Sequence, residues 1–333
     1  MEEHPGDAPD VCIDLAVVPG YGEDSFAFHF EEERGLLCVA DGCGGLGAKR
    51  YPSMDGYTGA YLAARIVTEC IAAWVAAGII FFPKTREAGE ELCKALASNL
   101  GREMNRREAL YASPGNRRIV SRMEKALPAT LCLALFQKAE QGMAEALFLW
   151  AGDSRGYLLD AGGLHQLTED HTSEGLDALE GLYGDAPLLN MVNGENSFWV
   201  SGRKVCLHAP AAVLTATDGA FMYLPTPMEF EWMLLSTLRD SSSLASWQGK
   251  LKNILKKVAS DDCTLLISLV GFESFERFRD AMEERCAYVQ QEYITPVRRR
   301  RQRLDFAREK WEQYREAYDW TRGKGHGELD WRI

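Results

Sequence analysis

Four aspartates stand beside strongly apolar stretches of the sequence. Asp41, Asp153 and Asp218 each follow such a stretch, and Asp262 precedes one. If these stretches are buried strands whose ends converge, unpaired carboxylates would repel one another strongly at low dielectric constant, so a cation must bind between them. Oxygen ligands without a histidine or cysteine cluster suit Mg²⁺ or Mn²⁺ better than zinc. The pattern therefore predicts a divalent metal site.

Each of these aspartates taken alone also fits an ordinary turn. Asp41-Gly42 and Asp218-Gly219 are common turn dipeptides, and Asp262 could simply precede a strand. Taken together, a turn interpretation must explain why all four aspartates border an apolar stretch. We therefore favour one metal site over four independent turns.

The elements that would position these residues follow the order strands, helices, strands, helices, strand. Apolar residues, alternating or continuous, predict strands at 11–18, 26–30, 36–40, 131–136, 146–150, 156–159, 204–207, 211–216 and 263–270. Helical periodicity and strong helix formers predict helices at 56–77, 87–111, 228–238 and 244–258. This order favours a layered α+β fold.

The sequence after Gly271 has a different pattern. Acidic and basic residues are almost equal in number there, and a basic run covers 298–301. Aromatic residues recur at helical spacing, which predicts a charged helical extension at 272–333 after a domain at 10–271. A solvated or charge-paired helix is the ordinary interpretation of such a run. An arm that docks a protein partner and a tail that folds onto the acidic domain are the alternatives.

Composition and charge exclude several classes of function. The chain of 333 residues has a formal net charge of −12, the wrong sign for binding a phosphate backbone, so we expect no nucleic acid partner. Nine scattered cysteines without a C-x-x-C pair indicate buried thiols in a reducing compartment. The first residues do not resemble a signal peptide, so we expect a cytoplasmic protein. Arg65 and Glu69 interrupt the apolar stretch 59–82, which favours a core helix over a membrane span.

Six short motifs occur in a characteristic order along the first 271 residues. They are 23–26 (Glu-Asp-Ser-Phe), 39–45 (Val-Ala-Asp-Gly-Cys-Gly-Gly), 128–130 (Pro-Ala-Thr), 152–155 (Gly-Asp-Ser-Arg), 217–219 (Thr-Asp-Gly) and 260–264 (Ser-Asp-Asp-Cys-Thr). This set resembles the metal-dependent serine/threonine protein phosphatases of the PPM family (protein phosphatase 2C), bacterial type. The resemblance implies a four-layer α-β-β-α sandwich, in which helix pairs flank two antiparallel sheets and the metals lie at one end.

The resemblance assigns most of the predicted metal ligands. Asp41 would bridge two Mn²⁺ or Mg²⁺ ions, and the Gly42 carbonyl would contact one of them. Asp218 and Asp262 would hold the other ion. Two such ions can polarise a water and neutralise the phosphoryl oxygens during in-line attack, so these three aspartates would be catalytic through metal-bound water.

Three further carboxylates complete the set that the resemblance implies. Glu23 and Asp24 would act on the first ion, partly through waters, and Asp153 would help to bind a weaker third ion. Arg155 and Thr130 would be structural, the first by ion pairing. The loop 173–195 would either shape access of the substrate or be an ordinary acidic surface loop.

The sequence departs from the family pattern at three positions. Pro19 occupies the place of the usual phosphate-binding arginine, Cys43 replaces the histidine of eukaryotic members, and Cys263 replaces an asparagine. Lys49 or Arg50 could supply the missing positive charge, because they lie in an apparent insertion just after the Gly-rich loop. Solvated surface charge is the alternative for both.

The function predicted from these residues is hydrolysis of phosphoserine and phosphothreonine on proteins, with a phosphorylated protein as the substrate. The alternative is a catalytically weak, phosphatase-like binding or regulatory module that uses the extension at 272–333 to hold a protein partner. The missing arginine supports the alternative, whereas the full set of metal carboxylates supports the enzyme.

Overall fold

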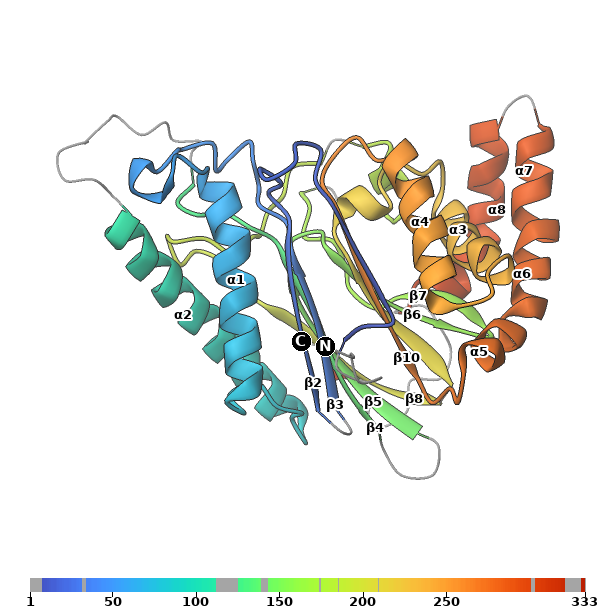
Figure 1. Ribbon diagram of the computed structural model, residues 1–333, viewed down its shortest axis with the longest axis horizontal. Helices are drawn as coiled ribbons and strands as arrows, with labels where there is room; N and C mark the ends of the chain where they lie inside the picture. The colour runs from blue at the N-terminus through green and yellow to red at the C-terminus, as the bar shows by residue number, and fades with distance from the viewer. Residues whose placement is uncertain are drawn as a thin grey trace.

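Two antiparallel β-sheets stack face to face at the centre of the protein, and helices cover both outer faces (Figure 1). The computed structural model describes residues 8–31, 34–111, 125–138, 143–173, 175–184, 186–208, 210–300, 303–320 and 331–332. The α+β fold class with two antiparallel sheets that the sequence predicts is confirmed.

The strands are arranged in one five-stranded and one six-stranded sheet. The first sheet contains, in spatial order, β1 (Val11–Leu15), β10 (Cys263–Val270), β9 (Ala211–Ala216), β6 (Arg155–Asp160) and β7 (Gly163–Gln166). The second contains β11 (Trp331–Arg332), β8 (Ser201–His208), β5 (Met143–Ala151), β4 (Leu131–Lys138), β3 (Arg34–Ala40) and β2 (Ser25–Glu31). Strand β7 was not predicted, because its four residues, Gly-Leu-His-Gln, are too few and too polar to show an alternation of apolar and polar side chains.

The central strands are buried on both faces. In β3, Leu37 and Val39 pack between the two sheets, whereas Leu36 and Cys38 pack under the helices. Side chains alternate between the faces of a strand, so a strand in this position needs apolar residues at every position. This explains why the sequence reads as continuous apolar runs at 36–40 and 263–270.

Helices α1 (Gly59–Ala76) and α2 (Arg86–Tyr111) cover the six-stranded sheet. Helix α1 is long and apolar enough to cross a membrane, but 56% of it is buried inside the protein. Its apolar residues, Leu62 and Val67 among them, share one hydrophobic cluster with β3 and β4. Helix α1 is therefore packed as a core helix, and its Arg65 stacks on the Tyr61 ring at 3.3 Å.

The helices on the other face belong partly to the predicted extension. They are α3 (Pro227–Arg239), α4 (Leu244–Val258), α5 (Phe275–Ala281), α6 (Glu283–Val289), a π-helical turn (Gln290–Ile294), α7 (Thr295–Arg299) and α8 (Arg303–Tyr318). The extension is thus a series of helices instead of one long helix. Pro296 lies at the start of α7, just after the π-helical turn, where it removes a backbone hydrogen-bond donor.

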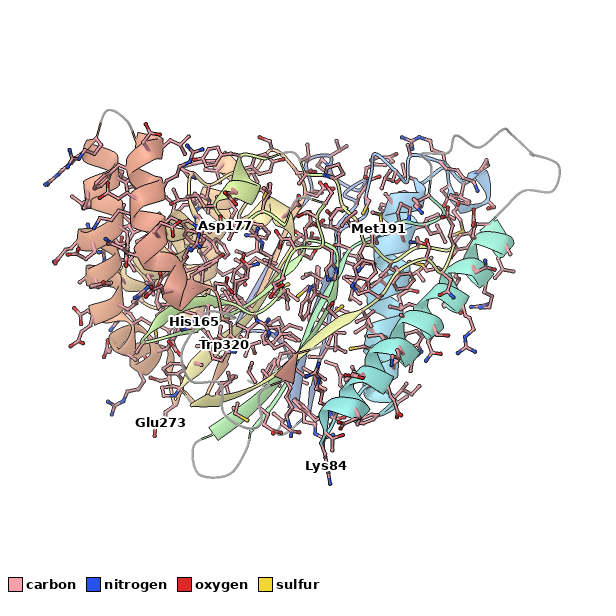
Figure 2. All side chains as sticks on the ribbon, turned by 180° about the vertical axis from the view of Figure 1, so that it is seen from behind. Lys84, His165, Asp177, Met191, Glu273 and Trp320 are labelled. Atoms are coloured by element: carbon pink, nitrogen blue, oxygen red, sulfur yellow. The ribbon has the colours of Figure 1, made fainter. Side chains whose placement is uncertain are left out.

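The helices of the extension are folded onto the domain. Phe278, Trp311, Tyr314 and Tyr318 are buried in the same hydrophobic cluster as α3, α4 and the five-stranded sheet. Just beyond α8, Trp320 meets the His165 ring of β7 edge-on at 5.6 Å (Figure 2). Of the two alternatives to a solvated helix, folding onto the domain is the one seen in the described part of the extension.

A buried carboxylate joins the extension to the rest of the core. Glu231 of α3 has no exposed surface, and it accepts hydrogen bonds from the Arg285 guanidinium at 2.7 and 3.0 Å. The Tyr314 hydroxyl donates to it at 2.6 Å and the Leu164 N–H at 3.2 Å. Helices α3, α6 and α8 and strand β7 therefore meet at one satisfied ion pair.

We predict that Arg285→Ala lowers the free energy of unfolding by about 3–5 kcal/mol, because it leaves the Glu231 charge buried without its cation. Arg308→Ala is the matched control on the same extension, since its pair with Asp305 is exposed, and we expect a change of at most about 1 kcal/mol. Urea denaturation of both variants measures the difference. Equal effects would contradict a structural role for the buried pair.

Candidate metal centre

The strand register brings the predicted acidic residues to one end of each sheet. In the first sheet, Ala216 at the end of β9 pairs with both Leu265 and Arg155 near the starts of β10 and β6. Asp218, Asp153 and the Asp261-Asp262 pair flank these three positions in the sequence. In the second sheet, Ala40 at the end of β3 pairs with Ser25 at the start of β2, which places Asp41 beside Asp24.

Electrostatic coupling shows which of these carboxylates lie near one another. Burial, followed by repulsion from Asp218, Asp24, Asp153 and Asp261, raises the pKa of Asp41 well above its usual value. Burial and Asp24 raise the pKa of Asp218 to about 7. Burial and Asp218 raise the pKa of Asp153 to about 8. The four ends thus form one acidic site in which each negative charge disfavours the next.

Among the described residues, no three aspartate, glutamate, histidine or cysteine side chains are close enough to form a complete metal cluster. The donor chemistry nevertheless fits a hard divalent ion, because carboxylates outnumber the two thiols, Cys43 and Cys263, that interact with the same aspartates. In addition, Asp24 Oδ1 is buried without a hydrogen-bond partner. A buried carboxylate oxygen without a donor is an atom that a cation or its hydration water would satisfy.

Asp24 is held rigidly at the junction of the two sheets. Its Oδ2 accepts hydrogen bonds from the hydroxyls of Thr217 at 2.7 Å and Thr264 at 2.9 Å. Burial raises its pKa to about 7, although these two hydrogen bonds act in the opposite direction. Asp24 therefore lies between the strand ends that carry Asp218 and Asp261.

Glu23 is positioned next to the Gly-rich loop. The Thr58 hydroxyl, which also caps α1, donates to Glu23 Oε1 at 2.5 Å, and the Gly42 N–H donates to the Glu23 carbonyl at 3.2 Å. A Cβ atom at Gly44 would lie 2.3 Å from Glu23 Oε2. A side chain at position 44 would therefore displace the Glu23 carboxylate from its place beside Thr58.

Asp262 accepts hydrogen bonds from two backbone N–H groups. Its Oδ1 accepts the Val17 N–H at 2.7 Å and its Oδ2 accepts the Glu23 N–H at 2.6 Å. The charge of Asp261 is among the main causes that raise the pKa values of both Asp41 and Asp218. Asp262 thus holds the loop between β1 and β2 by hydrogen bonds at both ends of that loop. Because Val17 bonds Asp262 instead of a neighbouring strand, β1 ends at Leu15 and not at Val18, where the sequence predicted its end. Asp262 also acts on Glu23 and Asp24, whose pKa values its charge raises, and the metal-ligand role predicted for it stays a prediction.

Thr130 links the loops that carry Asp41 and Asp153, which is a structural role, as the resemblance implied. It accepts the Asp41 N–H at 3.0 Å, donates its own N–H to the Asp41 carbonyl, and shares a 2.6 Å hydrogen bond with the Ser154 hydroxyl. Gly152 has a φ of +106°, and a Cβ there would lie 2.8 Å from Thr130 Cγ2. The loops that carry Asp41 and Asp153 are therefore set by local packing.

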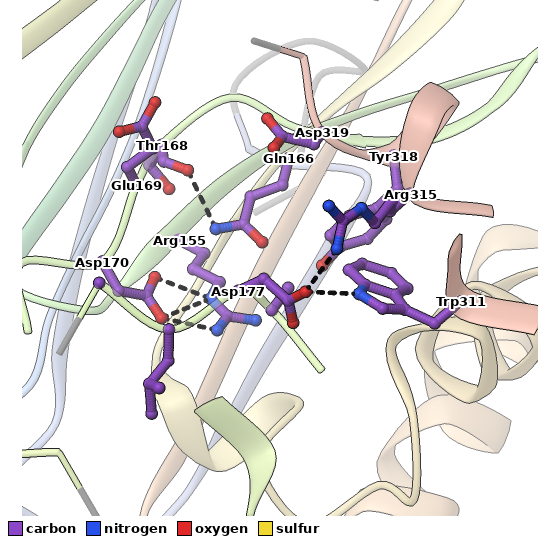
Figure 3. A pocket seen from close by; sticks show the side chains of 13 residues that line it. Arg155, Gln166, Thr168, Glu169, Asp170, Asp177, Trp311, Arg315, Tyr318 and Asp319 are labelled. Atoms are coloured by element: carbon purple, nitrogen blue, oxygen red, sulfur yellow. Dashed lines mark hydrogen bonds and ion pairs between the residues drawn. The ribbon is translucent and has the colours of Figure 1, made fainter. Parts of the chain in front are cut away.

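Arg155 forms an ion pair with Asp170, which is the structural role predicted for it (Figure 3). Its guanidinium is 1% exposed and makes a bidentate pair with Asp170 at 2.6–2.9 Å. His171, the residue after Asp170, makes two hydrogen bonds to Gly152. Its Nδ1 accepts the Gly152 N–H at 3.1 Å, and its backbone N–H donates to the Gly152 carbonyl. The start of the predicted access loop is thereby tied to the loop that carries Asp153.

The two predicted phosphate-binding residues differ in their surroundings. Lys49 donates to Glu108 at 2.8 Å and lies over the Tyr51 ring, so its charge is neutralised by α2. Arg50 donates to the Gly56 carbonyl, and its charge acts on Glu23. Of the two, Arg50 is the one whose charge reaches the acidic site.

Several solved structures share this architecture. Stp1, a serine/threonine phosphatase from Staphylococcus aureus, matches with a TM-score of 0.54 and 14% identity, over 81% of this chain and 99% of its own. The Mycobacterium tuberculosis serine/threonine phosphatase PstP/Ppp matches with a TM-score of 0.51 and 17% identity, over 78% and 97%. The PstP catalytic domain in complex with two manganese ions gives 0.50 and 18%, over 78% and 96%.

The chain has the fold of the bacterial PPM phosphatases. No protein-family model and no curated protein matches the sequence. The likeness to the PPM structures is therefore one of fold, at 14–18% identity in the three structures above. Within this PPM fold, the acidic site lies where the strands of both sheets end.

We predict opposite behaviour for the two adjacent aspartates in protein without added metal. Asp262→Asn should lower the free energy of unfolding by about 1–2 kcal/mol, because the Val17 and Glu23 N–H groups bond different carboxylate oxygens, and the amide NH₂ that replaces one of these oxygens cannot accept a hydrogen bond. Asp261→Asn should be neutral or slightly stabilising, since it removes a charge that repels Asp41 and Asp218. Urea denaturation in the presence of a chelator measures both, and a larger loss for Asp261→Asn would contradict these two roles.

Proposed function

We propose that the protein is a metal-dependent phosphatase that hydrolyses phosphoserine and phosphothreonine on proteins. The observation that carries this proposal is that the strand ends of a PPM-type fold bring Asp218 and Asp261 near Asp41, so that both charges raise the pKa of Asp41. The PPM structures that the chain resembles are serine/threonine phosphatases, and one of them holds two manganese ions. A phosphorylated protein is accordingly the proposed substrate.

The proposed ligand set follows from the coupled carboxylates. Asp41, Asp218 and Asp261 would hold two Mn²⁺ or Mg²⁺ ions together with the Gly42 carbonyl and Glu23, and Asp153 would take part in binding a weaker third ion. Such ions neutralise the phosphoryl oxygens and activate water for hydrolysis.

The chain's own residues would orient this set. Thr217 and Thr264 fix Asp24, Thr58 fixes Glu23, and Thr130 fixes the backbone of Asp41. Asp262 enters the proposal as the anchor of the loop that carries Glu23. Preorganised groups of this kind lower the energy needed to reach the reactive geometry.

Arg50 is the proposed substitute for the phosphate-binding arginine whose place Pro19 occupies. Its guanidinium lies near enough to Glu23 to lower the pKa of that carboxyl, against the larger effect of burial. Arginine suits a phosphoryl group because its planar fork can donate two hydrogen bonds. No disulfide joins the cysteines among the described residues, which supports the proposal of a reducing, cytoplasmic location.

Manganese-dependent hydrolysis of p-nitrophenyl phosphate tests the function directly. We expect activity that requires Mn²⁺ or Mg²⁺, and Asp218→Asn should reduce kcat by at least about a hundredfold, because it removes a ligand of a catalytic metal. Asp305→Asn, an exposed aspartate on α8, is the control and should leave kcat unchanged.

The second arm of this experiment uses a phosphothreonine peptide and the same variants. Loss of activity in Asp218→Asn together with unchanged activity in Asp305→Asn would support the enzyme. A purified, folded protein that binds Mn²⁺ but hydrolyses neither substrate would refute it, and would favour the phosphatase-like binding module.

A further inference from the structure

The loop between β1 and β2 presents large apolar side chains to solvent. Val17, Val18 and Tyr21 are 59%, 55% and 61% exposed, and Pro19 between them is exposed as well. A single exposed apolar side chain is ordinary on a protein surface, whereas several together are typical of a binding site. This loop is therefore a candidate binding surface.

A tight turn holds these side chains in one arrangement. The Tyr21 N–H donates to the Val18 carbonyl at 3.0 Å, and Gly20 has a φ of +82°. Proline in the second place and a left-handed glycine in the third are the residues of a type II turn, in which Pro19 fixes one φ and Gly20 provides the positive one. The apolar side chains are therefore displayed by a well-defined backbone.

The turn is also anchored on both sides. Val17 and Glu23 donate their N–H groups to Asp262 at 2.7 and 2.6 Å. The Arg65 guanidinium of α1 donates to the Gly22 carbonyl at 3.1 Å. A surface that is preorganised in this way loses little conformational entropy when a partner binds.

A row of aromatic rings runs from α1 to the turn. The Arg65 guanidinium lies 3.3 Å from the centroid of the Tyr61 ring. Tyr57 stacks on Tyr61 with the centroids 3.9 Å apart, and Tyr21 follows at 6.0 Å from Tyr57. Tyr57 and Tyr61 are half-buried, whereas Tyr21 at the outer end is mostly exposed. An apolar side chain of a partner that packs on Tyr21 would extend this row.

The turn and the row of rings meet the proposed metal centre at Glu23. Gly22 alone separates Tyr21 from Glu23 in the sequence. Thr58, the residue after Tyr57, donates its hydroxyl to Glu23 Oε1 at 2.5 Å. The apolar surface is therefore continuous with the site at which the phosphorylated residue is proposed to bind.

This continuity decides which partner fits the surface. Successive residues of a peptide chain are about 3.8 Å apart, so a phosphorylated residue at the metal centre carries its neighbours, within about three positions, to the turn. Pro19, which stands in the place of the family's phosphate-binding arginine, belongs to the turn. At this position the chain offers apolar surface to the residues beside the phosphate instead of a charge to the phosphate itself.

We propose that the turn surface, formed by Val17, Val18, Tyr21 and Tyr57, binds a large apolar side chain next to the phosphorylated residue of the protein substrate. The inference rests on the proposed function. It narrows the substrate class to phosphoproteins that have an aliphatic or aromatic residue close to the phosphorylation site. Burial of one such side chain is enough for a preference of about tenfold.

Hydrolysis of two phosphothreonine peptides tests the turn surface. One peptide has leucine at the two positions on each side of the phosphothreonine, and the other has serine at the same positions. We expect kcat/KM to be at least about tenfold higher for the leucine peptide, mainly through a lower KM, because a leucine side chain is buried on binding. p-Nitrophenyl phosphate, which has no neighbouring residues, measures the reaction at the metal centre alone.

Substitutions in the turn locate the preference. The double variant Val18→Ser and Tyr21→Ser should reduce kcat/KM at least about tenfold more for the leucine peptide than for p-nitrophenyl phosphate, because it removes the apolar surface and keeps the Pro-Gly pair of the turn. Tyr21→Phe should keep the preference, since the ring and not the hydroxyl makes the contact. Phe81→Ser is the matched control and should also keep it, because this 48% exposed ring lies beyond the other end of α1.

Binding without hydrolysis separates this inference from the proposed function. Dye-labelled forms of both peptides are titrated with Mn²⁺-loaded Asp218→Asn protein, with and without the two serine substitutions, and followed by fluorescence anisotropy. We expect the leucine peptide to bind at least about tenfold more tightly than the serine peptide, and the two serine substitutions to remove the difference. Thermal unfolding checks that each variant is folded.

Equal affinities for the two peptides, or a preference for leucine that survives the two serine substitutions, would overturn the turn surface. Hydrolysis of p-nitrophenyl phosphate would in that case still support the proposed function. Conversely, a protein that hydrolyses neither p-nitrophenyl phosphate nor peptide but prefers the leucine peptide through the turn would refute the proposed function and keep the binding surface. Absence of both hydrolysis and preference would refute both.

Discussion

Repulsion among buried carboxylates is the constraint on which this structure depends. Asp41, Asp153 and Asp218 each have a pKa raised by burial and by at least one of the other acidic residues at the strand ends. Charges of one sign are expensive to hold together in a low-dielectric environment. The fold holds them together all the same, because the strands that precede them are buried on both faces and their ends have no freedom to separate.

The protein stabilises some of these carboxylates internally and leaves others for a ligand. Asp262 is satisfied by two backbone N–H groups, and Asp24 by two threonine hydroxyls on one of its oxygens. Asp41 is held through its backbone instead, by Thr130. Some carboxylates therefore fix loops by hydrogen bonds, and others carry a charge that a cation would neutralise. The neighbours Asp261 and Asp262 differ in this respect.

The sequence predicted the elements well because the strands are apolar on both faces and the first helices are strongly patterned. The helix predicted at 244–258 and the strand at 263–270 coincide with α4 and β10. The sequence could not separate Asp261 from Asp262, because both precede the same strand and only the path of the loop at 16–24 decides which carboxylate meets it. It also missed β7, whose edge position is defined by its pairing with β6 and not by its own residues.

The change in composition at residue 271 does not coincide with a break in packing. Aromatic residues of α8 complete the same hydrophobic cluster as α3, and Glu231 is satisfied only where α3, α6 and α8 meet. The charges of the extension are therefore used inside the protein as well as on its surface.

The extension also fixes the loop after β7. Trp311 and Arg315 of α8 donate hydrogen bonds to Asp177 of this loop. Nearer the start of the loop, Asp170 pairs with Arg155, close to the loop that carries Asp153. The extension thus takes part in setting the shape of the loop whose start is hydrogen-bonded to Gly152 beside Asp153, which a loosely attached arm could not do.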